Sequence, residues 1–565
     1  MSGRGSKSPF PGTIFMPLLT QTFKARLPHW IPIALISLLG SGIYSGAIQG
    51  GFKWDDHILI EDDRSIKTWS DTAGIFFKPL YRFKTYYRPL QTLSYKLDYA
   101  FWGMDPKGYH FTNIFLHIFN AALVYLLFSQ ISRSRISALF GALIFTCHPA
   151  LAEPVNYISS RSDLLVAAFT LLVFIFYNFF NLYRKKKYYA YSLLCLALSL
   201  LCKESAIVLP FVILGYECLF WKKFKRTLPF FAVAIVFILF RGSFMPARTE
   251  YIFNPSGLLS LPRGLLNYIA ALAFPHGLYK TWRLPLENPA GLTGFFTGIG
   301  LLCIFGYAAV RISKRSKEPL FGLAWTIITL APFLLLIFFY PPFLSGYSMP
   351  FSFAWLYTPS IGSFLYLTAL TVPMTGAWRK KTYALAAFIV LVLCALTISY
   401  NKAWTKPETE FFHGILRQLP ASRSSKGIQT NLGLSYMSEN KFDAALPIFL
   451  KAMEEDPRDT EALFNLGSIY LSRNELDKAL AYYRQALSID PSNPKIHYNI
   501  ALIHIKNNEI DAAIKELEMT AVLEPMHADA HYNLAILYAQ KSSQTQALRE
   551  YEILKSIEPG AFRTR

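Results

Sequence analysis

Long apolar segments alternate with short polar and basic segments along the first 400 residues of the chain. About eleven apolar segments are long enough to cross some 30 Å of hydrocarbon. They cover residues 30–50, 109–131, 136–152, 163–183, 188–202, 204–221, 228–247, 291–311, 319–340, 356–376 and 382–400. A further segment, 263–280, is short and interrupted by Pro275, so we expect it to be re-entrant or interfacial. The pattern predicts a tail at 1–29 and a polytopic helical membrane domain at 30–400.

A second pattern, with a period of 34 residues, begins after a polar linker at 401–425. The positions that repeat are Asn431-Leu432-Gly433, Asn465-Leu466-Gly467, Asn499-Ile500-Ala501 and Asn533-Leu534-Ala535, with Ala445, Ala479, Ala513, Ala547 and Pro457, Pro491, Pro525, Pro559. This period and these small residues resemble the tetratricopeptide repeat. The sequence therefore predicts an α-solenoid of four repeats over 426–561, and an all-α fold for the whole chain. The groove of such a solenoid suits an extended peptide or a partner helix, whereas a spacer or a self-association module is the alternative.

Composition and charge agree with a membrane protein. The chain is 53% hydrophobic and 16% aromatic, with a formal net charge of +20. The basic residues cluster in short segments between apolar runs, at 133–135, 184–187, 222–226, 311–317 and 379–381, so they indicate cytoplasmic loops and not a nucleic-acid partner. With the tail also cytoplasmic, the loop 51–108, the turns near 148–163 and 203–204, and the repeats all face the exoplasmic side.

Cysteines and glycosylation motifs bear on the compartment. The six cysteines lie in or next to apolar segments without metal-ligand spacing, so we expect neither disulfides nor a zinc site; they are Cys147, Cys195, Cys202, Cys218, Cys303 and Cys394. The predicted exoplasmic parts lack an Asn-x-Ser/Thr motif with x other than proline. The absence of this motif favours a multi-pass protein of a bacterial inner membrane with periplasmic repeats, over the endoplasmic reticulum with lumenal repeats.

Two adjacent carboxylates, Asp55 and Asp56, follow the first apolar segment directly. Neighbouring carboxylates push their pKa values apart, so one can act as a base while the other orients a group or assists a cation. A solvated loop is the alternative. The rest of the loop is rich in aromatic and basic residues, which suits either a platform that binds phosphate and sugar or a plain interfacial belt.

Further charged and polar residues lie at the ends of the predicted spans, where an unpaired charge is costly. Arg88, Arg161 and Lys203 are candidates to bind a phosphate. Supporting residues are His110, His148, Glu153, Asp163 and Glu204. A structural role is the alternative for the histidines and Glu153, and Lys203-Glu204 is also compatible with a simple surface ion pair.

Several short motifs together resemble one family, the transmembrane and tetratricopeptide-repeat-containing O-mannosyltransferases. The motifs are Trp54-Asp55-Asp56-His57, Tyr87-Arg88-Pro89-Leu90, Gly108-Tyr109-His110 with Asn113 and His117, His148-Pro149 with Glu153, Arg161 with Asp163, Lys203-Glu204, and the repeats. The resemblance implies a membrane glycosyltransferase of the GT-C class that takes a sugar from a polyprenyl-phosphate carrier on the exoplasmic side. In that family an acidic-basic pair precedes Tyr-x-Pro-Ser; here Tyr357-Thr358-Pro359-Ser360 follows Phe353-Ala354 instead.

The resemblance and the residues lead to one expected reaction, the transfer of mannose from a polyprenyl-phosphate sugar to a protein Ser or Thr hydroxyl. Asp55 is expected to take the acceptor proton, Asp56 to orient Asp55 or the acceptor, and the cations to stabilise the leaving phosphate. No cofactor is assigned; a divalent cation held by the two acids is left open. The membrane lipid, the donor and an acceptor polypeptide in the repeat groove are the expected partners.

Three other functions remain open at this point. The chain could be a GT-C transferase that acts on a lipid or a glycan. It could be a non-catalytic scaffold that anchors the repeats, in which case the loop charges have no explanation. A transporter would place its ionisable groups near mid-membrane in repeated halves, and the sequence has neither feature.

Overall fold

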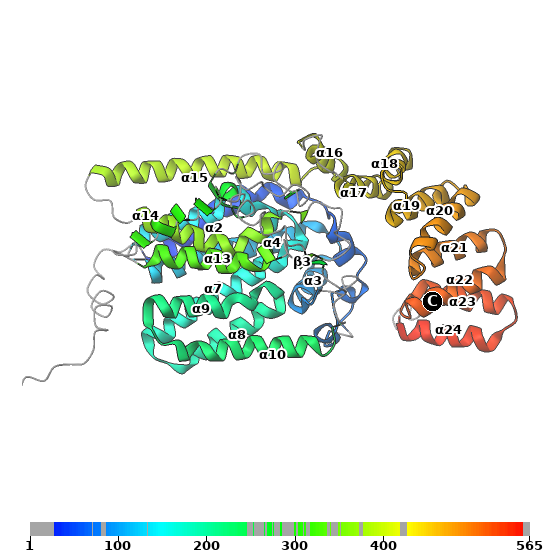
Figure 1. Ribbon diagram of the computed structural model, residues 1–565, viewed down its shortest axis with the longest axis horizontal. Helices are drawn as coiled ribbons and strands as arrows, with labels where there is room; N and C mark the ends of the chain where they lie inside the picture. Colours follow the sequence, from blue (N-terminus) through cyan, green and yellow to red (C-terminus); the bar gives the residue numbers. More distant parts are fainter. Residues whose placement is uncertain are drawn as a thin grey trace, which may run out of the picture. The chain divides into compact units, whose positions relative to one another are not determined.

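The structure is a computed structural model that divides into two compact units, residues 1–406 and 407–565. It describes residues 28–69, 72–80, 86–132, 134–245, 317–335, 352–371, 377–418 and 426–557, with isolated residues between 252 and 311 and at 339–340 and 349–350. Both units are helical, which confirms the predicted all-α fold (Figure 1).

The first unit is a bundle of helices with short 3₁₀ and π turns between them. Its α-helices are α2 (Trp30–Tyr44), α3 (Pro89–Trp102), α4 (Pro106–Ile131), α5 (Arg135–Cys147), α6 (Ala152–Asn156), α7 (Arg161–Tyr183), α8 (Lys186–Cys202), α9 (Leu209–Tyr216), α10 (Leu228–Gly242), α13 (Glu318–Leu335), α14 (Tyr357–Thr371) and α15 (Ala377–Trp404). The short turns are η1 (Ser45–Gln49), η2 (His57–Glu61), η3 (Arg64–Lys67), η4 (Gly74–Phe77), η5 (Pro149–Leu151), η6 (Ile158–Ser160), η7 (Glu204–Val208), η8 (Glu217–Trp221), η9 (Phe224–Thr227) and η12 (Phe353–Leu356).

Two pairs of two-residue strands interrupt the helical pattern. Strand β1 (Ile252–Phe253) pairs antiparallel with β3 (Phe339–Tyr340), and β2 (Arg283–Leu284) pairs antiparallel with β4 (Met349–Pro350). These ladders are too short to form a sheet layer, so they connect segments and do not change the fold class.

Helix α4 lies at the centre of this unit, because it packs against α2, α5 and α7 (Figure 1). The helix begins with Pro106 directly after Asp105, whose carboxylate accepts a hydrogen bond from the amide of Lys107. A proline at the first helical position and an aspartate cap are typical of a helix start. Helices α7 and α8 form an adjacent antiparallel pair, and α13 packs against α14.

Six helical stretches of the described residues are long and apolar enough to cross a membrane, or seven if one bent pair is counted. They correspond to the predicted spans at 30–50, 109–131, 163–183, 204–221, 319–340 and 382–400, and the bent pair to 136–152. The predicted spans at 188–202, 228–247 and 356–376 are helices α8, α10 and α14, of 17, 15 and 15 residues. The spans 263–280 and 291–311 are described only in part. Seven of the eleven predicted spans are thus matched by stretches of membrane length, three by shorter helices, and the span at 291–311 is described only in part.

The second unit is a series of antiparallel helix pairs after α16 (Glu408–Gln418). The pairs are α17 (Lys426–Ser438) with α18 (Phe442–Glu455), α19 (Thr460–Ser472) with α20 (Leu476–Ile489), α21 (Pro494–Lys506) with α22 (Ile510–Leu523), and α23 (Ala528–Gln540) with α24 (Gln544–Ile557). Each helix pair falls on one 34-residue period, as the sequence predicts.

Small residues allow the two helices of a repeat to approach closely. A Cβ atom on Gly467 would lie 2.6 Å from the ring of Tyr483, and one on Gly433 would lie 2.6 Å from the ring of Phe449. Asn440, Asn474, Asn508 and Ser542 adopt left-handed conformations at the same position of successive repeats. Asparagine tolerates this conformation better than most residues, so it ends the first helix of a repeat and starts the turn.

Candidate active site

The carboxylate pair follows a residue with an unusual backbone. Trp54 has φ 53°, in the left-handed region that a bulky residue rarely adopts. In the described part of the chain, the other non-glycine residues with positive φ all lie within two residues after a helix end, whereas Trp54 lies at the start of a helical turn. Its ring packs edge-on against Tyr157, at 5.4 Å between centroids, and against Trp404, at 6.1 Å. This packing stabilises a backbone that costs about 1–3 kcal/mol, a type of strain that clusters at functional sites.

Asp56 is buried, and both of its oxygens accept hydrogen bonds. One oxygen accepts from the amide of Ser159, at 2.8 Å, and from the Ser159 hydroxyl; the other accepts from the amide of Lys53, at 3.0 Å. Burial raises the pKa of Asp56 to about 7, although these hydrogen bonds lower it. Asp56 therefore fastens the loop to the turn η6, and its contacts suit a positioning role.

Asp55 points to a different environment and remains partly exposed. The Tyr157 hydroxyl accepts a hydrogen bond from the amide of Asp55, at 3.1 Å, and also contacts the Asp55 carboxylate. Burial raises the pKa of the Asp55 carboxyl, while the Tyr157 hydroxyl and the charge of Arg88 lower it. A partly exposed carboxylate with a raised pKa has the properties of a general base.

Of the three predicted phosphate ligands, Arg88 lies close enough to Asp55 for its charge to act on that carboxyl, and Lys203 lies near Arg88. Arg88 is partly exposed; its Nε lies 3.5 Å from Oε2 of Glu204, whose other oxygen accepts a hydrogen bond from the amide of Tyr87. Lys203 is buried, and its Nζ donates to both oxygens of Asp163 at 2.7 Å. Arg88 is thus the cation with the more open position, and Lys203 is largely neutralised by Asp163.

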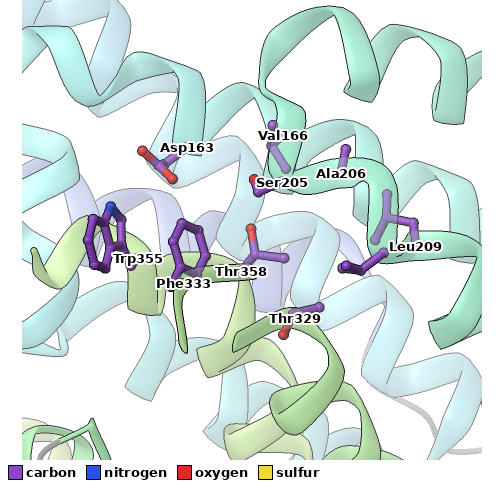
Figure 2. A pocket seen from close by; sticks show the side chains of 10 residues that line it. Asp163, Val166, Ser205, Ala206, Leu209, Thr329, Phe333, Trp355 and Thr358 are labelled. Carbon is purple, nitrogen blue, oxygen red and sulfur yellow. The ribbon is translucent and has the colours of Figure 1, made fainter. Parts of the chain in front are cut away.

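A pocket opens beside the Lys203–Asp163 ion pair. Its walls include Asp163 from α7, Ser205 from η7, Phe333 from α13 and Trp355 from η12 (Figure 2). The rings of Phe333 and Trp355 are stacked with centroids 5.1 Å apart. The two rings cover each other, and the space left in the pocket is about 10 Å³, which is room for about one water molecule.

Arg161 does not occupy the position expected of a phosphate ligand. Its side chain is fully buried and forms an ion pair with Asp98. Its Nε donates to Asn113 at 2.7 Å, and one terminal nitrogen donates to the carbonyl of Tyr109 at 3.0 Å. The guanidinium also lies 4.8 Å from the ring of Tyr95. With these partners Arg161 joins α3, α4 and α7, so its geometry favours a structural role over the predicted one.

Both predicted supporting histidines are buried among backbone groups. The Nδ1 of His148 accepts a hydrogen bond from the amide of Ala150, and its Nε2 lies 3.0 Å from the carbonyl of Leu272. His110 packs so closely that a Cβ atom on Gly50 would lie 2.8 Å from its Nε2. These contacts favour the structural alternative for the two histidines.

Glu153 contacts the segment where this chain departs from the family motif. Its oxygens accept hydrogen bonds from the Ser352 hydroxyl, at 2.7 Å, and from the amide of Phe353, at 3.3 Å. The carboxylate therefore lies at the N-terminus of η12, which leads into Tyr357 and α14. An anion is favourable at such an end, so Glu153 orients this segment.

Sequence reasoning did not single out Tyr157, Ser159, Trp404 or Arg241. The terminal nitrogen of Arg241 lies 3.8 Å from Oε1 of Glu204, the same oxygen that accepts a hydrogen bond from the amide of Tyr87. They come from three separate parts of the chain, since only Tyr157 and Ser159 are close in sequence, so no local spacing relates them to Asp55 and Glu204. The unusual feature visible in the sequence is the density of aromatic residues near the acids.

Comparison with known proteins agrees with the resemblance drawn from the motifs. Residues 99–244 match the family model of the dolichyl-phosphate-mannose-protein mannosyltransferases, and residues 430–494 and 474–530 match tetratricopeptide-repeat models. Human protein O-mannosyl-transferase TMTC3 is 23% identical over 500 residues, which cover 76% of this chain and 52% of the relative. Protein O-mannosyl-transferase Tmtc1 of Drosophila melanogaster is 30% identical over 182 residues, which cover 31% of this chain and 21% of the relative.

These matches confirm the resemblance to the O-mannosyltransferases with tetratricopeptide repeats, and the repeats within residues 430–530. They also agree with a membrane location, as the apolar helices do. The chain spans about half the length of the curated relatives that it matches over three quarters of its own length. The mannosyltransferase model covers Arg161, Lys203 and Glu204 but not the loop with Asp55 and Arg88.

Proposed function

We propose that the chain is a membrane glycosyltransferase that moves mannose from a polyprenyl-phosphate carrier to a Ser or Thr hydroxyl of a polypeptide on the exoplasmic face. One observation carries this proposal. Asp55 follows the strained Trp54, stays partly exposed, and lies close enough to Arg88 for that charge to lower its pKa. A base and a cation are thus near each other at the end of an apolar span, as group transfer from a phosphate requires.

In the proposed reaction, Asp55 accepts the proton of the acceptor hydroxyl while that oxygen attacks the anomeric carbon of mannose. The bond between the anomeric carbon and the phosphate oxygen breaks, and the polyprenyl phosphate leaves with the bonding electrons. Arg88 stabilises the negative charge on this leaving group. The attack inverts the anomeric configuration.

The other charged residues hold these two groups in place. Both oxygens of Asp56 accept hydrogen bonds, one from Lys53 in the loop and one from Ser159 in η6, which favours positioning over cation binding. Glu204 contacts Arg88 and Arg241, and so orients the cation. Lys203 and Asp163 form a buried ion pair, and Asp163 lies beside the stacked rings of Phe333 and Trp355.

The repeats are proposed to bind the acceptor polypeptide, since a solenoid of helix pairs presents an extended concave surface. The same exoplasmic compartment, a bacterial periplasm or an endoplasmic reticulum lumen, would contain the repeats and the carboxylate pair. A transferase acting on a lipid or glycan is the second candidate, because a GT-C site does not by itself select a polypeptide.

The test is transfer by purified full-length protein in nanodiscs with radiolabelled mannose on a polyprenyl phosphate. Nucleotide-linked mannose is offered in parallel, and peptides, glycans and lipids serve as acceptors. We expect label on peptides only, and only from the polyprenyl donor. Label on glycans or lipids alone would favour the second candidate. No transfer from any donor, with peptide binding by residues 407–565, would favour the scaffold.

A further inference from the structure

Two membrane-length stretches begin at the candidate site and end together at the opposite side of the unit. The first runs over Ile158–Tyr183, and the second over Glu204–Trp221. Asp163 and Glu204 lie at their starts. Because both stretches have the same direction, the turns that follow Tyr183 and Trp221 share the membrane surface away from the site.

The two turns have the same construction. Arg184 and Lys222 each adopt a left-handed conformation directly after the helical stretch, with φ 59° and 57°. Basic residues then continue the chain in both turns. We call this set the basic surface; it consists of Arg184, Lys185, Lys186, Lys187, Lys222, Lys223, Lys225 and Arg226, of which all but the last are exposed.

Specific contacts join the two turns into one surface. The Tyr189 hydroxyl donates to the carbonyl of Arg226 at 2.7 Å, and the Arg226 guanidinium donates to Asn181 at 2.8 Å. The Arg184 guanidinium lies 5.7 Å from the ring centroid of Trp221. Loops that only signal topology require no such contacts, since the positive-inside rule depends on charge alone.

The acidic side chains next to the basic surface are buried. Glu217, the single carboxylate within residues 181–191 and 217–228, is fully buried. One of its oxygens accepts a hydrogen bond from the Tyr177 hydroxyl, and the other accepts from the amide of Lys223 at 2.9 Å. Glu318, at the start of α13, is buried as well. The exposed part of both turns therefore has one sign of charge.

Exposed apolar side chains border the charges. Tyr183, Phe224 and Leu228 are each at least half exposed. They occur where two membrane-length stretches end, which is the depth of the lipid headgroups and of the aromatic belt. A soluble anion would contact only the basic residues, whereas a lipid contacts the basic residues with its headgroup and the apolar border with its acyl chains.

We propose that the basic surface binds the phosphates of anionic phospholipids of the surrounding bilayer. Lysine and arginine clusters directly beside membrane helices attract anionic headgroups, and here two turns are fixed together to present them. The ligand class is a phosphodiester with net negative charge and acyl chains. This site is separate from the candidate active site, and the proposal does not depend on the proposed transferase function.

The test compares lipids retained by the full-length protein after nanodiscs of mixed phosphatidylglycerol and phosphatidylcholine are opened in mild detergent. Native mass spectrometry reports the ratio of the two lipids on the protein. We expect phosphatidylglycerol to be enriched over its share in the bilayer, and the Lys222→Gln, Lys223→Gln, Lys225→Gln triple variant to lower that enrichment at least about twofold. A large excess of inorganic phosphate should displace little of the bound lipid, because it lacks the acyl chains.

The matched control removes three charges from another predicted cytoplasmic cluster, with Arg379→Gln, Lys380→Gln and Lys381→Gln. We expect this variant to keep the wild-type enrichment. Equal losses in both triple variants, or wild-type protein without enrichment, would overturn the proposal; the second result needs no variant, so misfolding cannot obscure it. Complete displacement by inorganic phosphate would also contradict it and would indicate a simple anion site.

Discussion

The two adjacent aspartates have different partners, and this difference defines their proposed roles. Asp56 is buried, with hydrogen bonds from Ser159 and Lys53, whereas Asp55 is partly exposed and contacts the Tyr157 hydroxyl. The strained backbone of Trp54 precedes both residues and turns the chain into the loop. Of the two carboxylates, Asp55 is therefore the one that an acceptor can approach.

At this scale Tyr157→Phe tests how the base is controlled. The substitution keeps the ring between Trp54 and Trp404 but removes the hydroxyl, which lowers the pKa of Asp55. Because a base must be ionised, transfer is lost as pH falls through the raised pKa of Asp55. Without the hydroxyl this pKa rises further, so the acid limb of kcat/KM should move to higher pH, with a rate at neutral pH lower by roughly 2–10-fold.

The control for this prediction is Tyr99→Phe, which removes a hydroxyl from α3 instead. Its pH profile should coincide with that of the wild type. An unchanged acid limb in Tyr157→Phe would mean that the hydroxyl does not affect the titrating base.

At the scale of elements, Asp56 fastens the loop after the first span to the turn η6. Asp56→Ala leaves the Ser159 and Lys53 amides without their acceptor, which costs about 1–3 kcal/mol for a buried group. We expect faster proteolysis within residues 51–69 and a lower thermal midpoint. Asp62→Ala, an exposed acid in the same loop, should change neither. Equal protease sensitivity of Asp56→Ala and wild type would contradict the anchoring role.

The close approach of paired helices in the repeats gives a second prediction at this scale. Gly467→Ala places a methyl group 2.6 Å from the buried Tyr483 ring, so one helix of the pair must shift. We expect the variant to lower the unfolding free energy of residues 407–565 by about 1–3 kcal/mol. Gly414→Ala, in α16, meets no atom within 4 Å and should be neutral or stabilising. Circular dichroism melts measure both, and an unchanged Gly467→Ala midpoint would contradict the packing.

The sequence predicts the elements better than the site. Apolar runs and the 34-residue period are local signals, so the long spans and the repeats could be predicted; α10 ends before its apolar run does. Contacts between distant residues have no such signal. The ion pair of Arg161 with Asp98 and the contact of Tyr157 with Asp55 each join segments that are far apart in the sequence. A charged residue that faces a ligand also looks the same in sequence as one that is buried.

At the scale of the whole molecule, the proposed function assigns chemistry to residues 1–406 and acceptor binding to residues 407–565. Removing residues 420–565 should therefore leave kcat for a short peptide nearly unchanged and raise KM for a long unfolded polypeptide, since that acceptor loses its second contact. Steady-state transfer to both acceptors measures this. The same proportional loss for both acceptors would indicate that the repeats stabilise the membrane unit instead.

The central claim is that Asp55 takes the acceptor proton, and the most direct test is transfer by Asp55→Asn beside Asp62→Asn in the same nanodiscs. An amide cannot accept the proton, so Asp55→Asn should lose about 10²–10⁴-fold in kcat while it still binds the donor. Asp62→Asn should match the wild type. Transfer by Asp55→Asn at the wild-type rate would contradict the account, because the carboxylate would then have no part in the reaction.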